Sequence, residues 1–182
     1  SIRDYYEREG GSRQFPELVI SYAMQWIQTG KNKPLGTADA LLRALQAMPS
    51  WKGRSFTVCN SDNLYSRAAL RTLLEDQHEH ALIDYDRSAL QFDQARIAEF
   101  AVIKKDQDGF LEEIIEKPSE NEIRAAADTD GRVGVSMNIF RFSYDRILPY
   151  LESVPLHPIR HEKELPTAVK MMIADHPRSV FT

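Results

Sequence analysis

The chain has 182 residues, of which 42% are hydrophobic and 27% are charged, a balance typical of a soluble globular protein with a buried core. Its formal net charge of −4 provides no basic field for a nucleic-acid backbone, so no nucleic-acid partner is expected. No apolar run approaches membrane-spanning length. The single cysteine, Cys59, permits no internal disulfide, and its apolar surroundings favour a core residue over a nucleophile. We therefore expect a cytoplasmic protein without a membrane partner.

The N-terminal segment predicts a helix end, a strand and a second helix, in that order. Residues 1–15 are charged and aromatic and have the character of a helix end followed by a loop at residues 10–12. Residues 17–26 predict a strand, because β-forming residues supply their apolar bulk. Apolar side chains then recur at helical spacing from residue 38 to residue 48, which predicts a helix that begins near Thr37.

Gly36 and Thr37 stand at the start of this predicted helix. Thr37 is a suitable N-cap residue, and Gly36 would let a ligand approach the backbone closely. The free amides and the positive dipole end of the helix could meet a phosphate or the edge of a base. An ordinary capped helix explains the same residues without any ligand.

A buried strand is predicted at residues 55–59, followed by a polar turn at residues 60–63 and a helix at residues 66–75. Asp62 lies just beyond the carboxyl end of this strand, where ligands bind in open parallel sheets. A lone carboxylate there suits a hard divalent cation with oxygen ligands. The alternative is that Asp62 only shapes the turn or caps the following helix.

Another strand is predicted at residues 80–85, and it ends in two acidic residues, Asp84 and Asp86. Their spacing is that of a metal-binding pair, although solvation of a strand end explains it more simply. Further along, an Asp-Gly pair between apolar runs at residues 97–105 and 109–116 is a strong hairpin signal.

The second hairpin strand ends at Glu116 and Lys117, because Pro118 removes a ladder donor. There a carboxylate that can accept hydroxyl protons lies beside an ammonium that can pair with phosphate. The alternative is a solvated strand end.

The last part of the chain predicts a strand, two helices and the start of another strand. Residues 133–142 are strand-like but carry Ser136 and Asn138, whose polar groups need a backbone, water or ligand partner if the strand is buried. Residues 143–151 and 165–175 predict helices. Residues 179–182 have the character of a strand that begins.

Four motifs in this order resemble those of the nucleotidyltransferases that make nucleotide sugars from a nucleoside triphosphate and a sugar 1-phosphate. Residues 34–41 (PLGTADAL) resemble the nucleotide-contacting turn of that family, and residues 58–65 (VCNSDNLY) resemble its metal-binding strand end. Residues 115–118 (IEKP) are similar to its sugar-phosphate motif, and residues 135–142 (VSMNIFRF) to the later strand that faces the sugar. Residues 164–166 (ELP) also have counterparts in a branch of the family.

The resemblance implies an α/β fold, namely a Rossmann-like three-layer α/β/α arrangement with a mixed, mainly parallel sheet, in a single domain over residues 1–182. It also implies in-line attack of the sugar phosphate on the α-phosphorus of the triphosphate, with release of pyrophosphate. Such chemistry depends mainly on positioning and charge neutralisation. The implied partners are a nucleoside triphosphate and a sugar phosphate, and a homo-oligomer is compatible with the family.

Residue roles follow from the same resemblance. Asp62 would hold Mg²⁺ and Lys117 would bind the sugar phosphate, and these two are the expected catalytic residues. Gly36 and Thr37 would contact the nucleotide together with Asp62. The hydroxyl groups of the sugar would be bound by Glu116 and Asn138.

The resemblance is incomplete, and other functions compete with it. The family's Gly-rich triphosphate loop has no counterpart in this sequence, and its second metal-binding Asp would follow Thr182. We therefore expect a sugar-phosphate nucleotidyltransferase domain that is incomplete at both ends and inactive by itself. The first alternative is a non-catalytic module that binds nucleotide sugars or has a regulatory role. The second is a metal-dependent glycosyltransferase that uses Asp84 and Asp86, which leaves the motifs at residues 36–38 and 116–118 unexplained.

Overall fold

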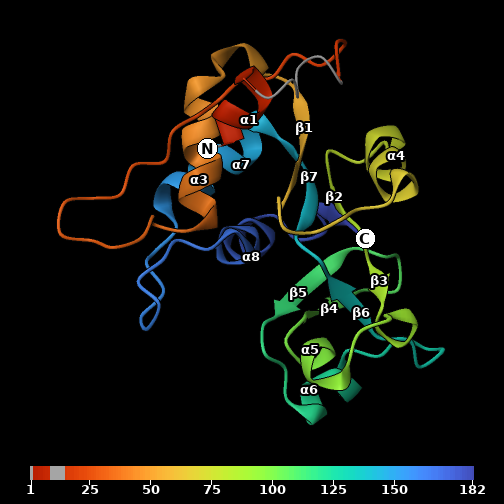
Figure 1. The fold of residues 1–182 in the computed structure, drawn as a ribbon. Helices are drawn as coiled ribbons and strands as arrows, with labels where there is room; N and C mark the ends of the chain where they lie inside the picture. Colours follow the sequence, from red (N-terminus) through yellow and green to blue (C-terminus); the bar gives the residue numbers. More distant parts are fainter. Residues whose placement is uncertain (1, 9–14) are drawn as a thin grey trace.

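A central four-stranded sheet organises the molecule in the computed structural model, which describes residues 2–8 and 15–182 (Figure 1). Its strands, in spatial order, are β1 (Ser55–Cys59), β7 (Ile139–Ser143), β2 (His80–Leu82) and β8 (Val180–Phe181). β7 runs antiparallel to both of its neighbours, whereas β2 and β8 are parallel.

Helices cover both faces of this sheet. One face carries α3 (Thr37–Ala47), α7 (Tyr144–Ser153) and α8 (Leu165–Asp175), and the other carries α4 (Arg67–Glu75). Alternation along β7 decides which side chain faces which layer: Phe140 and Phe142 pack among α3, α7 and α8, while Ile139 packs with Leu73 of α4. The predicted α/β fold with three layers and a mixed sheet is confirmed. The expected excess of parallel pairs is not found among the described strands, because β7 lies between β1 and β2.

A second four-stranded sheet, wholly antiparallel, lies below α8 in Figure 1. Its strands, in spatial order, are β3 (Tyr85–Asp86), β6 (Gly134–Ser136), β4 (Ala101–Lys105) and β5 (Leu111–Ile115). Val102 and Val135 pack on one face with Ile123 of α6 (Glu120–Ala125). On the other face, Ile103 and Ile114 join the core that α8 shares with the central sheet.

The remaining described elements are short: α1 (Ile2–Arg8), the 3-10 turns η1 (Pro49–Trp51) and η2 (Arg87–Ala89), and α5 (Gln94–Ala98). The expected helix end near the N-terminus is confirmed by α1, whereas the loop expected at residues 10–12 lies outside the described residues. No helix of the described part of the chain is long and apolar enough to cross a membrane.

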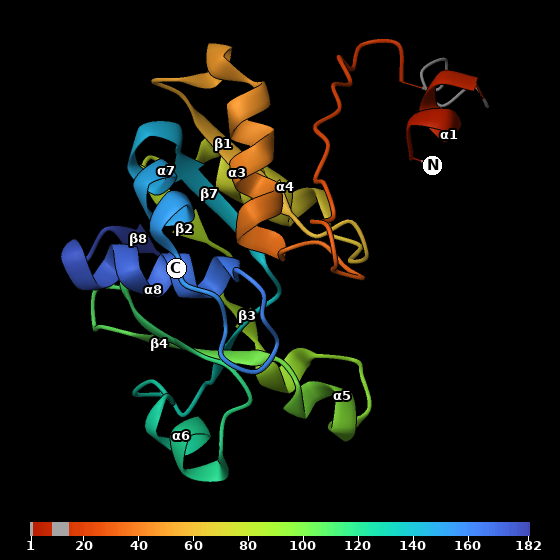
Figure 2. The same cartoon turned by 90° about the vertical axis from the view of Figure 1, so that its left-hand side faces the viewer.

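The strand predicted at residues 17–26 is wrong. This segment is extended and pairs with none of the described strands, and Figure 2 shows it running beside α3 toward α1. Most of its apolar side chains face solvent, with Val19 95% and Trp26 74% exposed. A strand needs a neighbour for its backbone groups as well as a β-forming sequence.

Two other predicted strands are each divided between the two sheets. The run at residues 133–142 forms β6 and β7, which are separated by Met137 and Asn138, and the run at residues 80–85 forms β2 and the start of β3. The hairpin strand expected from residue 97 begins instead at Ala101, because Asp93 caps α5 just before it. The hairpin itself and the helices predicted near residues 37, 66, 143 and 165 are confirmed.

Cys59 is exposed, so its expected place in the core is wrong. The reason lies in the position of β1 at the edge of the central sheet. The strand has only one neighbour, and both of its end residues face solvent.

Candidate functional site

A cavity of about 140 Å³ brings together three of the predicted site residues, Thr37, Glu116 and Asn138. Thr37 begins α3, Glu116 follows β5, and Asn138 lies between β6 and β7. The rest of the wall is formed by Asn60, Glu162, Glu164, Leu165 and Pro166. Motifs from distant parts of the chain therefore converge on one place.

The N-terminal ends of α3 and α8 are tied together at this cavity. The amide of Ala38 donates to the carbonyl of Lys163 at 3.0 Å, and the amide of Leu165 donates to Oγ1 of Thr37 at 3.0 Å. Thr37 is therefore the first residue of α3 and not its N-cap, which is Gly36. The expectation of a Thr37 cap is wrong, because its side chain is turned toward the neighbouring helix.

Gly36 adopts a left-handed φ of 107°, and the atom closest to the position that a Cβ would occupy is a backbone oxygen. A Cβ atom at this position would lie 2.6 Å from the carbonyl oxygen of Lys163. The close approach that glycine permits here is thus made by the segment before α8, whereas we expected a ligand to make it. A contact between Gly36 and a nucleotide stays a prediction.

Glu116 of the cavity wall is paired with Arg160, a residue that sequence motifs did not indicate. Its Oε2 accepts a hydrogen bond of 2.8 Å from Arg160, whose guanidinium also lies 2.6 Å from the carboxylate of the buried Glu164. The hydrogen bond to Glu116 raises the pKa of Arg160. The i, i+4 spacing of Arg160 and Glu164 is the sequence signal that predicts part of this network.

The turn that carries Asp62 is held in place by Tyr65, a second residue that the sequence did not single out. The Tyr65 hydroxyl donates to the carbonyl of Met137 at 2.8 Å and accepts from the Asn60 amide at 3.3 Å and the Asn63 side chain at 3.1 Å. Tyr65 thereby joins the turn after β1 to the turn that carries Asn138. Asp62 itself is exposed, outside the wall of the cavity.

Asn138 and Lys117 occupy left-handed conformations at the ends of strands, with φ values of 55° and 49°. The Asn138 amide donates to Oγ of the buried Ser136 at 3.3 Å, so the polar group on this strand has a backbone partner. Lys117 is exposed next to Glu116, and its ammonium forms no ion pair within the described ranges. It is therefore available for an anionic ligand.

The donor set around Asp62 fits a magnesium ion only if a substrate completes the coordination. No group of three or more His, Cys, Asp or Glu side chains suited to a metal occurs in residues 2–8 and 15–182. Mg²⁺ retains several waters and is commonly held by one or two carboxylates together with substrate phosphates. A single exposed carboxylate satisfies that requirement.

Comparison with known proteins identifies the family of this chain. Residues 3–180 match the family model described as Nucleotidyl transferase. The chain belongs to this family. It is also similar to a glucose-1-phosphate adenylyltransferase of Koribacter versatilis (strain Ellin345), with 26% identity over 124 residues. That match covers 68% of this chain and 29% of the relative, so the chain spans less than a third of the relative's length.

Asp84 and Asp86, the alternative metal-binding pair, are engaged by other side chains in this member of the nucleotidyl transferase family. Oδ2 of Asp84 lies 2.6 Å from Lys105 and 2.7 Å from Arg132, and its side chain is only 7% exposed. Asp86 accepts hydrogen bonds from the amide and hydroxyl of Ser88. On Asp84 these partners engage Oδ2 alone, because Oδ1 is buried without a hydrogen-bond partner among the described residues. A metal at this pair would compete with Lys105 and Arg132 for the Asp84 carboxylate.

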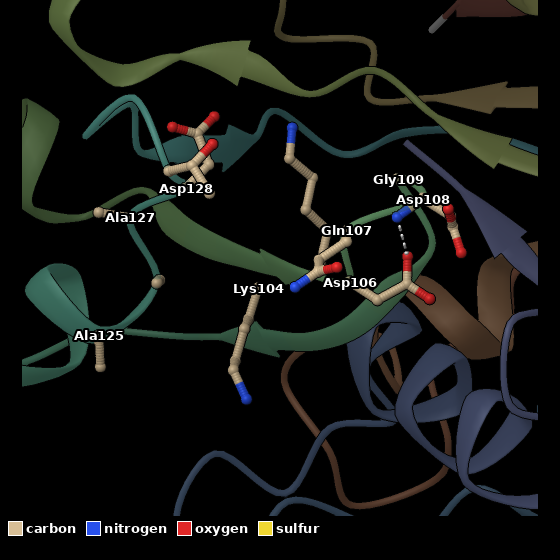
Figure 3. A pocket seen from close by; sticks show the side chains of 11 residues that line it. Lys104, Asp106, Gln107, Asp108, Gly109, Ala125, Ala127 and Asp128 are labelled. Atoms are coloured by element: carbon tan, nitrogen blue, oxygen red, sulfur yellow. Dashed lines mark hydrogen bonds between the residues drawn. The ribbon is translucent and has the colours of Figure 1, made fainter.

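A larger hollow of about 760 Å³ lies between the β4–β5 turn and the end of α6 (Figure 3). Figure 3 shows Lys104, Asp106 and Asp128 at its border, with the Asp106 carboxylate accepting from the Asp108 amide. None of the residues predicted from the family motifs lines it. Because size alone does not indicate chemistry, we assign the site to the smaller cavity.

Proposed function

We propose that the protein joins a nucleoside triphosphate to a sugar 1-phosphate, giving a nucleotide sugar and pyrophosphate. The observation that carries this proposal is the convergence of Thr37, Glu116 and Asn138 on one cavity. Family membership supports the transfer of a nucleotidyl group, and the similar protein of Koribacter versatilis is named for adenylyl transfer to glucose 1-phosphate.

In the proposed reaction, an oxygen of the sugar phosphate attacks the α-phosphorus of the triphosphate. The new bond forms as the bond to the β-phosphate bridging oxygen breaks, and pyrophosphate leaves with that electron pair. The protein contributes orientation and positive charge, which dominate phosphoryl-transfer catalysis. Mg²⁺ held by Asp62 would neutralise charge on the phosphates.

The residues that line the cavity, and Lys117 and Arg160 next to Glu116, have chemistry suited to these roles. Carboxylates and amide oxygens accept hydrogen bonds from hydroxyl groups, so Glu116 and Asn138 would bind the sugar ring. Lys117, with its free ammonium, would bind the sugar phosphate. The Arg160 guanidinium, held in place by Glu164, would stay at the cavity when sugar hydroxyls replace its bond to Glu116.

The test is release of pyrophosphate from triphosphates incubated with sugar 1-phosphates and magnesium. Asp62→Ala in the complete protein should abolish turnover without unfolding it, since Asp62 is exposed. Glu116→Gln should lower kcat/KM about ten- to a hundredfold, because it weakens hydrogen bonds made by a charged group. Glu113→Gln on β5, just before Glu116, changes an exposed residue outside the cavity. This matched control should leave kcat/KM unchanged.

Full activity of the Asp62 variant would remove the metal role. Release of free nucleoside diphosphate in place of pyrophosphate would instead favour a glycosyltransferase.

A second candidate function is binding of a nucleotide sugar without catalysis. It requires only the hydrogen-bonding side chains at the cavity, such as Glu116 and Asn138, and neither a metal nor a triphosphate. This alternative predicts that a nucleotide sugar binds and protects the protein from unfolding, while no triphosphate releases pyrophosphate.

A further inference from the structure

A separate cavity of about 260 Å³ lies at the other end of the central sheet. It is bordered by the start of β2, by α7, and by the segment between α8 and β8. The register of β1 against β7 pairs Ser55 with Ser143 at this end and Cys59 with Ile139 at the end near Asn138. His80 of the cavity contacts Ser143, so the cavity is distinct from the candidate active site.

Two polar side chains bring buried hydrogen-bond donors to this cavity. His80 is 2% exposed, and its Nδ1 accepts from the Ser143 amide at 3.2 Å, which leaves the proton of the neutral ring on Nε2. Burial lowers the pKa of His80, so the ring stays neutral at neutral pH. Oγ of Ser179 is also buried at the wall, without a hydrogen-bond partner among the described residues. Buried polar groups normally have partners, and both donors can be satisfied by an acceptor.

One arginine, Arg146, supplies an available positive charge beside these donors. Arg146 of α7 lies 3.8 Å from Glu79, and because both side chains are more than half exposed, this pair is weak and leaves the guanidinium available. Arg178 is fixed by Asp106 and Asp108 at 3.2 Å and 2.8 Å, so its charge is largely compensated. The imidazoles of His78 and His176 also lie at the wall of this cavity.

We propose that this cavity binds a small oxyanion of the phosphate class, either inorganic phosphate or a phosphate monoester. An oxyanion offers acceptors to the His80 and Ser179 donors and a negative charge to Arg146. A cation is disfavoured, because the described residues contain no cluster of His, Cys, Asp and Glu suited to a metal. The volume suits a ligand smaller than those of typical drug-sized pockets. This inference does not depend on the proposed function.

The test is a titration of the full chain, labelled with ¹⁵N at histidine, with inorganic phosphate at constant ionic strength. We expect saturable shifts of the His80 and His176 ring signals. Arg146→Gln, at an exposed position that the fold tolerates, should weaken binding about tenfold or more, since it removes a charge-assisted hydrogen bond. Arg124→Gln is the matched control, because Arg124 lies on α6 and outside the cavity. It should not change the affinity for phosphate.

Glu79→Gln gives the sharpest outcome, because this carboxylate lines the cavity and competes with an anion for Arg146. The proposal expects tighter binding of phosphate by the Glu79 variant. Weaker binding by that variant, equal losses in the two arginine variants, or shifts that never saturate would each overturn it. A parallel titration with glycerol phosphate separates the two sources: tighter binding than phosphate assigns the site to a monoester, and weaker binding assigns it to the free ion.

Discussion

Gly36 shows how a single residue without a side chain allows two helices to start at the same place. Its φ is left-handed, and the Lys163 carbonyl oxygen lies 2.6 Å from where a Cβ would be, which leaves room only for hydrogen. The resulting contact lets Ala38 donate to Lys163, which brings α3 and α8 together at the candidate site.

Gly36→Ala should therefore destabilise the protein by about 1–3 kcal/mol, through left-handed strain and the clash with Lys163. Urea denaturation measures this cost. Gly131→Ala is the matched control, because Gly131 has a positive φ of 78° but nothing within 4 Å of its Cβ position. Equal losses in the two variants would show that the clash with Lys163 contributes nothing.

Tyr65 acts at the same scale, since its one hydroxyl serves three polar groups of two turns. Tyr65→Phe should loosen the turn that carries Asp62 and lower kcat about tenfold in the pyrophosphate assay, with a stability loss of about 1–2 kcal/mol. Tyr150→Phe removes a hydroxyl that bonds Asp175 on the outside of α7 and α8, and should leave kcat unchanged. An unaltered kcat for the Tyr65 variant would mean that its hydroxyl only stabilises the fold.

At the scale of elements, the molecule depends on two places where the chain crosses between its sheets. One crossing joins β2 to β3 at Asp84, and the other joins β6 to β7 at Asn138. Asp84 is held by Lys105 and Arg132, and Gly134 leaves the space that the Asp84 carboxylate fills. The first crossing is thus pinned to both β4 and the segment before β6.

Asp84→Ala should destabilise the protein by about 3 kcal/mol, because it leaves two partly buried cations without their shared carboxylate. Thermal or urea denaturation of the variant provides the measurement. Asp108→Ala removes a carboxylate that is 66% exposed and also paired with an arginine, and its cost should be small. A comparable cost for both variants would contradict a special role of Asp84 at the crossing.

At the scale of the whole molecule, one apolar core connects the layers. Side chains of α8 share it with Phe140 and Phe142 of the central sheet and with Ile103 and Ile114 of the second sheet. His80 lies beside Phe142 of this core, and its Nδ1 accepts a hydrogen bond from the amide of Ser143 at the end of β7. A titratable side chain, that of His80, is therefore buried next to the core that connects the layers.

The stability of the whole molecule should rise with pH through the range in which His80 titrates. Burial lowers its pKa from 6.5, an effect that Glu79 opposes and Arg146 and His176 reinforce. Below pH 6.5 the unfolded chain binds a proton that the folded chain does not, so stability falls as the pH falls toward the folded pKa and is highest above 6.5. Urea midpoints between about pH 7.5 and about pH 5.5 measure the slope.

His80→Asn keeps an acceptor for the Ser143 amide but cannot titrate, so its urea midpoint should depend less on pH. A variant with the slope of the unmodified protein would show that another group carries the pH dependence. His161→Asn, at an exposed histidine, is the control and should retain the slope.

Features that depend on neighbouring residues were predictable from the sequence. The hairpin at Gly109 follows from a turn residue between apolar runs, and α3 and α8 follow from apolar spacing. Local motifs also indicate Thr37, Glu116 and Asn138, which the fold places around one cavity. Their convergence is a consequence of topology that no local pattern contains.

Features that depend on distant partners were decided only by the tertiary structure. Residues 17–26 have the composition of a strand, but no described strand pairs with them, and Cys59 is exposed because β1 is an edge. The hydroxyl of Thr37 binds a helix that begins at Leu165, and Glu116 accepts a hydrogen bond from Arg160. The physical reason is common to all four: backbone and side-chain polar groups bond whichever partner the packed core brings within reach, and that partner can be anywhere in the chain.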